Sequence, residues 1–479
     1  MPWTPIAQRF NQLPLILAGP LLRHTTYDEV TVWVALKEAS TVTLTIYQEE
    51  GNAQLAPLFS GARPTVQLGR HLHVVAVTAH APPNQPLAPG HLYYYDLQFA
   101  GGAIQGGLRA SGVVSTPPPG PGERNALSYS DTHLLPSFAL PPDDLNKLRI
   151  VHGSCRKTHS EGRDATEALD RVLAADWAFP DRRPHQVFFT GDQIYADEVP
   201  ACLLAPLTDA GNFLLAGLNG AGQLDWEETL AGDILPLEQA SDTLPVTGNK
   251  PSQIPPGSRR RVVLKKAAFS TREGQNHLLG LGEYLAMYLA VWADVIWPPE
   301  LPTHDDLFST LPADEGRVKH FNAEREAVLQ LRTVMPPIRR ALANIPSYMI
   351  CDDHETTDDW YVTREWCADV MQTQLGRRVM LNAMLAYAVC QAWGNTPEQY
   401  TGAEPGAALL SAASAWVQSN LENGSHRQAV AQRVGIPDTE AEVSAFVASV
   451  NQLPLGRVPR TAQMLDWHYT RRWRSHEVI

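Results

Sequence analysis

Two short acidic segments, each placed directly after an apolar run, constrain this chain more than any other feature. Residues 191–198 (GDQIYADE) follow the run 186–190, and residues 352–360 (DDHETTDDW) follow the run 348–351. Short apolar runs of this kind are typical of buried strands, and a parallel sheet places its ligands at the carboxyl ends of its strands. Carboxylates with an imidazole suit a metal that activates water or binds phosphate. The sequence therefore predicts a metal site at one edge of a sheet.

Length and charge limit the class of protein. The chain has 479 residues, which is enough for two or three domains, and 44% of them are hydrophobic, so a sizeable core can form. The net charge of −13 argues against a nucleic-acid partner or an anionic membrane surface. A phosphate ester is still an acceptable substrate, because a bound metal reverses the local field.

The cysteines and the apolar segments indicate the compartment. The five cysteines are odd in number and form no CxxC pair, which excludes a disulfide framework and a zinc knuckle. No apolar stretch is long enough to span a membrane. Residues 13–19 are as apolar as a signal peptide, but they lack a basic leader and run into strand-like sequence. We interpret them as a strand of the mature fold, which favours the cytoplasm. The oligomeric state is not predicted.

The first 120 residues have the pattern of an all-β domain. Alternating apolar residues mark strands at 29–36, 41–47, 72–77 and 92–97, and several short strands at this spacing predict a β-sandwich of the immunoglobulin or fibronectin kind. The proline-rich stretch 116–122 reads as a stiff linker. We therefore place the sandwich at 1–120 and a linker at 121–147.

Residues 148–479 have the pattern of an α/β domain. A strand at 148–152, a helix at 164–175 and a strand at 186–190 form a βαβ unit, which predicts a parallel pair of strands. Residues 200–275 read as a long insertion near a site. Further helices are predicted at 278–297, 324–344, 376–393, 405–421 and 438–451, and the second of them is interrupted at Pro336 and Pro337. A final strand is predicted at 464–468.

The loops after the βαβ strands carry candidate ligands. Cys155, in the segment 153–157 (GSCRK), follows the first strand. It is either a small buried hydrophobe or, beside a cation, a thiolate ligand. Asp192 either caps its loop or bridges two metals with its two oxygens. Tyr195 could return to the same metal as a phenolate, but on the residues alone we interpret it as core packing.

The third loop adds an acid and an imidazole. Asp353 can ligate a metal, and His354 can act on the phosphoryl group or its leaving oxygen. The alternative is a solvated acidic turn, which fits less well directly after a buried strand. Arg156 and Lys157 either bind phosphate oxygens or face solvent, and the sequence leaves both open.

Taken in order, these motifs resemble one family. The series GSCR (153–156), GDQIY (191–195) and DDHExxDDW (352–360) is similar to that of the PhoD-like, or alkaline phosphatase D, branch of the metallophosphatases. The resemblance implies a metallophosphatase-like α/β domain after an N-terminal β-domain, and metal-dependent hydrolysis of a phosphate monoester or diester. It covers residues 148–199 and 330–362 closely, and residues 1–120 in architecture.

The resemblance also implies ligands and metals. Family motifs assign Cys155, Asp192 and Tyr195 as ligands of a ferric ion, with Asp192 bridging to calcium. The cofactors expected on this basis are Fe³⁺ and Ca²⁺, and another divalent metal fits the same donors.

The third motif supplies the remaining site residues. By the same resemblance Asp353 is a metal ligand and His354 contacts the phosphate. The family often has Asn where Asp358 or Asp359 stands, which makes either one a calcium-side ligand, and we take Asp358. Arg156 is the second catalytic candidate, as a contact to the phosphate.

The chain departs from the family pattern at its end. Residues 465–471 resemble the Asp-x-Arg segment after which family members add a Gly-Asp-Val-His loop, and this chain ends at Ile479 without one. The expectation is a fragment or a natural truncation that lacks the C-terminal half of its sheet. The alternative function is therefore a catalytically weak relative that acts as a binding or structural module. A metal hydrolase for another class of ester is a third reading.

Overall fold

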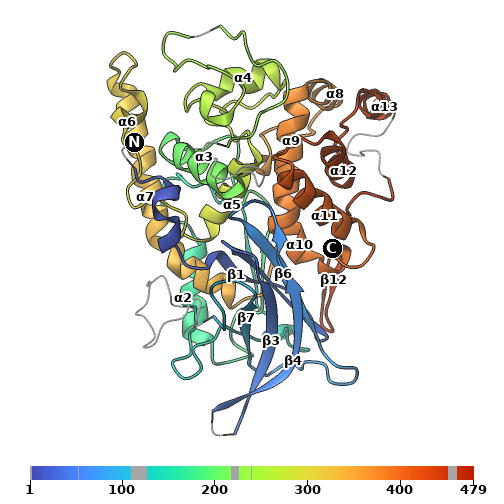
Figure 1. Ribbon diagram of the computed structural model, residues 1–479. Helices are drawn as coiled ribbons and strands as arrows, with labels where there is room; N and C mark the ends of the chain where they lie inside the picture. Colours follow the sequence, from blue (N-terminus) through green and yellow to red (C-terminus); the bar gives the residue numbers. More distant parts are fainter. Residues whose placement is uncertain are drawn as a thin grey trace.

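The computed structural model describes residues 3–51, 53–108, 127–216, 226–238, 240–450, 452 and 461–479. It is a mixed α/β structure, with two four-stranded antiparallel sheets, one three-stranded parallel sheet and a helical region that lies above the antiparallel sheets in Figure 1. The predicted linker at 116–122 lies outside the described residues, and the proposed division at 120 and 147 stays a prediction.

The N-terminal residues form the two antiparallel sheets. Strands β3 and β4 of one sheet lie against β6 of the other, and along β3 every second side chain is buried, as half-buried strands require. The strands predicted in this region are confirmed. The first sheet is ordered β1 (Ile16–Thr25), β2 (Glu29–Leu36), β6 (His73–His80), β5 (Val66–Gln67), and the second β4 (Gln54–Pro64), β3 (Thr41–Glu50), β7 (Tyr93–Ala100), β8 (Ser137–Phe138).

Strands β1 and β2 are buried on both faces, because one face packs on the helical region. Trp33 of β2 donates from its indole Nε1 to the carbonyl oxygen of Val389 at 2.8 Å, and its ring meets that of Trp292 edge to face. These contacts join the antiparallel sheets to the helical region.

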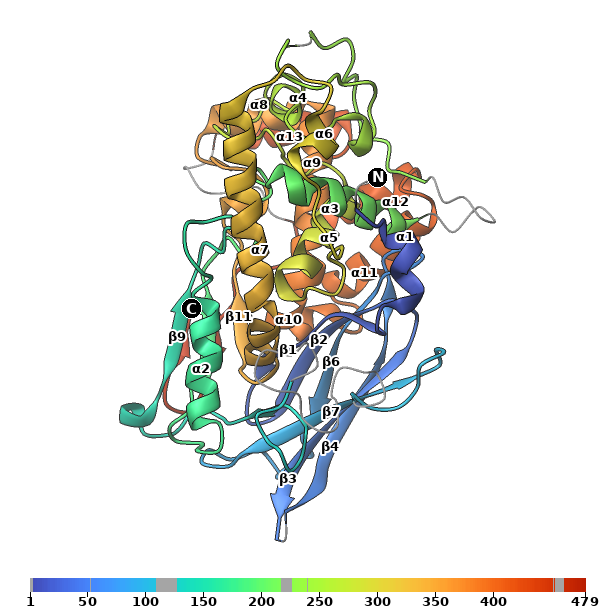
Figure 2. The same cartoon turned by 90° about the vertical axis from the view of Figure 1, so that its left-hand side faces the viewer.

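The parallel sheet positions the predicted site. Its order is β11 (Ser347–Met349), β10 (Gln186–Phe189), β9 (Ile150–Gly153), and Phe189 pairs with Gly153 on one side and Met349 on the other. The βαβ unit is confirmed, with helix α2 (Thr166–Asp176) between β9 and β10. The carboxyl ends of all three strands therefore lie at one edge. Helix α2 packs on the long helix α7 (Glu315–Ala343) beside this sheet (Figure 2).

Two sequence predictions about the later elements were wrong. Helix α7 runs through Pro336 and Pro337, because burial of the flanking Met335 and Ile338 compensates for the two missing N–H donors. Residues 464–468 form no strand, and the backbone of Leu465 donates instead to the carbonyl oxygen of Arg433.

The remaining elements complete the helical region and the C-terminal end of the fold. A helix forms at the start of the segment predicted as an insertion, and a short C-terminal hairpin lies near the parallel sheet. Within the described residues no helix combines the length and the apolar character needed to cross a bilayer. The elements are α1 (Ile6–Arg9), α3 (Ala201–Leu215), α4 (Arg259–Lys266), α5 (Leu281–Trp292), α6 (His304–Phe308), α8 (Arg364–Gln372), α9 (Gln374–Tyr387), α10 (Trp393–Asn395), α11 (Pro405–Gln418), α12 (Gly424–Val434), α13 (Glu440–Val450), β12 (Arg471–Arg472) and β13 (Glu477–Val478).

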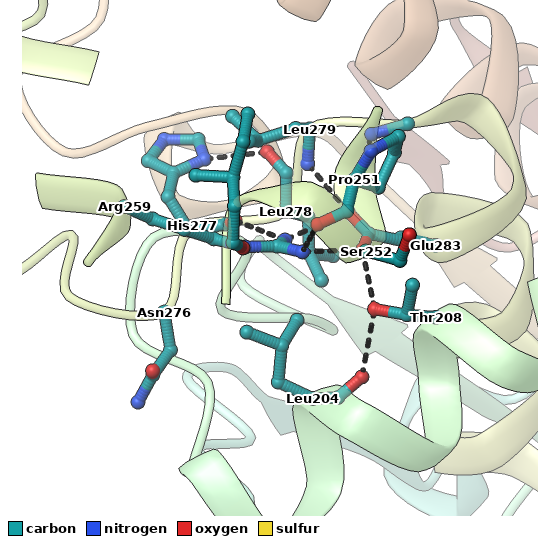
Figure 3. A network of polar contacts seen from close by, with 12 residues as sticks. Leu204, Thr208, Pro251, Ser252, Arg259, Asn276, His277, Leu278, Leu279 and Glu283 are labelled. Atoms are coloured by element: carbon teal, nitrogen blue, oxygen red, sulfur yellow. Dashed lines mark hydrogen bonds and ion pairs between the residues drawn. The ribbon is translucent and has the colours of Figure 1, made fainter. Parts of the chain in front are cut away.

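A buried ion pair fixes the segment between α3 and α5 (Figure 3). Arg259 and Glu283 are each 1% exposed and make two charge-assisted hydrogen bonds, of 2.8 and 2.9 Å. Arg259 also donates to the carbonyl oxygens of Pro251 and His277, and the hydroxyl of Thr208 on α3 donates to Glu283. With its polar atoms satisfied in this way, the pair holds α4 against the helices below it.

We predict that Glu283→Gln lowers the free energy of unfolding by about 3–5 kcal/mol, because it leaves the buried Arg259 charge uncompensated. Urea denaturation monitored by circular dichroism measures the change. The matched control is Glu477→Gln in the exposed pair with Arg472, for which we expect a change of about 0–1 kcal/mol. Equal losses in the two variants would contradict the prediction.

Candidate metal centre

The loops that follow β9 and β10 are bonded to each other. The backbone N–H of Cys155 donates to the carbonyl oxygen of Gly191 at 3.2 Å, and that of Arg156 donates to the carbonyl oxygen of Asp192 at 2.8 Å. Cys155 and Asp192 both have left-handed backbones, with φ of 59° and 52°. Non-glycine residues adopt this conformation at a cost, which is met more often at functional sites than elsewhere.

Asp192 is the centre of the cluster. Its Oδ2 accepts a hydrogen bond from the Cys155 thiol and another from the Tyr195 hydroxyl, each at 3.3 Å. Its Oδ1 is buried and has no partner among the described residues. Burial raises the pKa of Asp192, and the charges of Asp352 and Asp353 add to that shift. A buried acceptor without a donor is expected to have a partner that the protein itself does not supply.

Asp353 and His354 bring the third loop to the same place. One ligand atom from each of Asp192, Asp353 and His354 lies within 4.8 Å of the other two. The His354 ring stacks on that of Tyr195, with 4.3 Å between centroids. Its Nδ1 donates to Oδ1 of Asp197 at 2.8 Å, which leaves Nε2 for a cation or a phosphoryl oxygen.

Asp197 sets the charge of His354. Burial disfavours the imidazolium, but the hydrogen bond and charge of Asp197 outweigh it and raise the pKa of His354 to about 9. Asp197 is almost fully buried, and its Oδ2 accepts from the Thr271 hydroxyl at 2.8 Å and from the Asp358 backbone at 3.1 Å. Sequence reasoning missed this residue, although it lies in the same segment, 191–198, as Asp192.

Glu355 was also missed as a site residue. Its buried carboxylate accepts hydrogen bonds from the backbone N–H groups of Asp192, Gln193 and Asp352, at 3.0, 2.6 and 2.8 Å. Burial raises the pKa of Glu355 to about 8, although these N–H groups stabilise its charged form. Glu355 lies in the acidic segment 352–360, which the sequence identified, but the sequence did not show which of these carboxylates is buried.

Two predicted site residues have other partners in the structure. Arg156 is buried, and its guanidinium donates to Asp164 at 2.9 and 3.1 Å and to the carbonyl oxygen of Val291 at 3.1 Å. Asp358 meets the cluster through its backbone N–H, which binds Asp197, and its carboxylate is not part of the close triad. Their roles as a phosphate contact and a calcium-side ligand stay predictions. The ammonium group of Lys157 pairs with Glu198.

The residues present fit a cation. Two carboxylates and an imidazole surround one point, a thiol and a phenol adjoin it, and a buried carboxylate oxygen lacks a donor in the described part of the chain. Oxygen, nitrogen and sulfur donors in this combination suit a transition-metal ion better than magnesium. Across the described residues, no second group of His, Cys, Asp or Glu meets the same spacing.

Comparison with known proteins adds little to this geometry. No family model and no curated protein matches the chain. A solved structure titled "Structure of PhoD" is similar to it with 12% sequence identity and a TM-score of 0.32. The similarity covers 78% of this chain and 46% of that one, so the chain spans less than half of that protein. A superposition this loose transfers neither fold nor activity, and the function has to be inferred from the residues themselves.

We predict that Asp197→Asn lowers the pKa of His354 from about 9 toward its ordinary value of 6.5, because the variant removes the charge that faces Nδ1. The pKa is measured in metal-free protein by NMR titration of ¹⁵N-labelled imidazoles, with the His354 signal identified from its loss in His354→Gln. Asp181→Asn, in an exposed pair with Lys147, is the control and leaves the titration unchanged.

The same shift sets the direction of the pH dependence of stability. Because the folded pKa is raised, the contribution of the Asp197–His354 pair is complete below pH 6.5 and is lost as the pH rises through about 9. A pKa that stays near 9 in Asp197→Asn would show that Asp197 is not its source.

Proposed function

We propose that this chain is a metal-dependent phosphoric ester hydrolase of the PhoD-like type. The observation that carries the proposal is the convergence of Asp192, Asp353 and His354 within 4.8 Å at the end of a parallel sheet. The Cys155 thiol and the Tyr195 hydroxyl both donate to Oδ2 of Asp192. A set of hard oxygen donors with one imidazole and one thiol is suited to a cation that binds phosphate.

The proposed metals are Fe³⁺ and Ca²⁺. Cys155 and Tyr195 would hold the ferric ion together with Asp192, since thiolate and phenolate ligands pair with an ion that can deprotonate them. Asp353 and Asp358 would serve the calcium side with oxygen ligands. The spare oxygen of Asp192 supports its assignment as the bridge between the two ions.

The chain's own residues would position the substrate and move a proton. When bound, the metals supply charge that polarises the phosphoryl oxygens and lowers the pKa of water. In hydrolysis a water oxygen forms a bond to phosphorus as the bond to the alcohol oxygen breaks, and the alcohol takes up a proton. His354, held by Asp197 through Nδ1, offers Nε2 to the phosphoryl or leaving oxygen. Arg156, paired with Asp164, would support the Cys155 loop.

We predict that the purified chain contains metal and hydrolyses an aryl phosphate, and that Asp192→Asn loses both, by at least about a hundredfold in kcat/KM. Elemental analysis and release of 4-nitrophenol are the measurements. The exposed Asp144→Asn, on a loop before β9, is the control and keeps both properties. Wild-type protein without metal and without activity, after reconstitution with iron and calcium salts, would refute the proposed function.

A second prediction tests the ferric ion alone. A ferric ion bound by Tyr195 gives a visible phenolate-to-iron absorption band, and Tyr195→Phe removes that band while its ring still stacks on His354. Absorption spectra of the two proteins at equal iron content are compared, with Tyr129→Phe, a half-buried tyrosine paired with Asp170, as the control. A band that persists in Tyr195→Phe would assign it to the thiolate or to another ligand.

A further inference from the structure

A cavity of about 410 Å³ opens beside the candidate centre, between the parallel sheet, α2 and α7. Its wall is mainly apolar, and each of the three elements contributes to it. Pockets of this size commonly hold an organic group of small-molecule dimensions. The apolar side chains used below are Val151, Val187 and Phe189 from the sheet, Ala168 and Val172 from α2, and Leu331 from α7.

The cavity reaches the candidate centre at one of the proposed metal ligands. Cys155 lines it, and the Cys155 thiol is 3.3 Å from Oδ2 of Asp192. An ester whose phosphoryl group meets Asp192 therefore has its alcohol group within reach of this opening. The charged residues of the wall are Arg156, Lys157, Arg163 and Asp164. Arg156 pairs with Asp164, and the other two cations pair with Glu198 and Glu167, so each cation already has a carboxylate partner.

We propose that this cavity binds the apolar alcohol group of the substrate, so that the preferred substrates are aryl phosphate esters with one or two rings. The inference rests on the proposed function, because it assigns the cavity to the leaving group of that reaction. The driving force is the removal of the ring's apolar surface from water against Val151, Val187 and Phe189. Phe189 contributes an aromatic ring to the lining that an aryl group can contact.

A second cavity provides the competing site. It has a volume of about 1040 Å³ and is lined by Lys157, Glu198, Arg260 and Glu324 among others. Its wall carries charges of both signs, and it contains none of the proposed metal ligands. If the alcohol group were bound there, a polar alcohol such as glycerol would be preferred. Comparing an aryl ester with a glycerol ester distinguishes the two cavities.

The test compares 1-naphthyl phosphate with glycerol 3-phosphate in the metal-loaded full chain. The variant is Val172→Lys, which puts a charge on the wall of the cavity at a position that is 44% exposed and therefore tolerant in folding. Val172→Met keeps the wall apolar. The control is Leu145→Lys, at a residue that is 60% exposed and does not line the cavity.

We expect the wild type to favour the naphthyl ester, and Val172→Lys to lower kcat/KM for that ester by about tenfold without changing it for glycerol 3-phosphate. Val172→Met and Leu145→Lys should leave both values unchanged. A second readout does not depend on activity. The binding of 1-naphthol to metal-free protein is followed by its fluorescence, and the dissociation constant of this complex should rise by a similar factor in Val172→Lys.

Several results would overturn the inference. They are an equal loss with both esters, a wild type that favours glycerol 3-phosphate, and naphthol binding that Val172→Lys leaves intact. Hydrolysis of neither ester refutes the proposed function, and the naphthol titration then decides the cavity separately. Naphthol binding that only Val172→Lys weakens would support an aryl site in that case as well.

Discussion

The buried carboxylate of Glu355 holds the candidate centre together. It accepts hydrogen bonds from the backbone of Asp192 and Gln193 after one strand, from Asp352 after the next, and from the side chain of Gln391. Hydrogen bonds to backbone N–H groups are strong when water is excluded. Two loops about 160 residues apart in the sequence are therefore bonded to the side chain of Glu355. The same bonds hold the left-handed backbone of Asp192.

The anchored loops place like charges close together. Asp192 and Asp353 lie in one cluster with Asp352 beside them, and the repulsion appears as a raised pKa of Asp192. The imidazolium of His354 offsets part of this charge, and Asp197 in turn stabilises the imidazolium. Buried carboxylates without full compensation are costly, so a bound cation would relieve the site. Stability and metal binding are expected to be coupled here for that reason.

Local sequence patterns predicted the elements that carry the site. Apolar runs of four or five residues located β9, β10 and β11 to within about two residues, and the helix between the first two indicated a parallel pair, which the pairing of Phe189 with Gly153 confirms. These predictions succeed because strand burial and helix periodicity are local properties. Prediction failed at Pro336 and Pro337, where packing of α7 outweighs the local preference against proline.

The sequence by itself determined which residues follow each strand of the parallel sheet, and so which chemical groups meet at its edge. Cys155, Asp192 and Asp353 could be named on that basis. Only the tertiary structure decided what each group faces. In the folded chain Arg156 bonds Asp164 and the backbone of α5. His354 bonds Asp197, which lies 157 residues earlier in the sequence.

The cavity beside Cys155 is likewise a property of the tertiary structure, because its walls come from the sheet, α2 and α7. The physical reason is the same in each case. The direction of a side chain after a strand follows from local backbone geometry, whereas its partner is set by whichever distant element packs against it. That packing depends on the whole core and leaves no local pattern in the sequence.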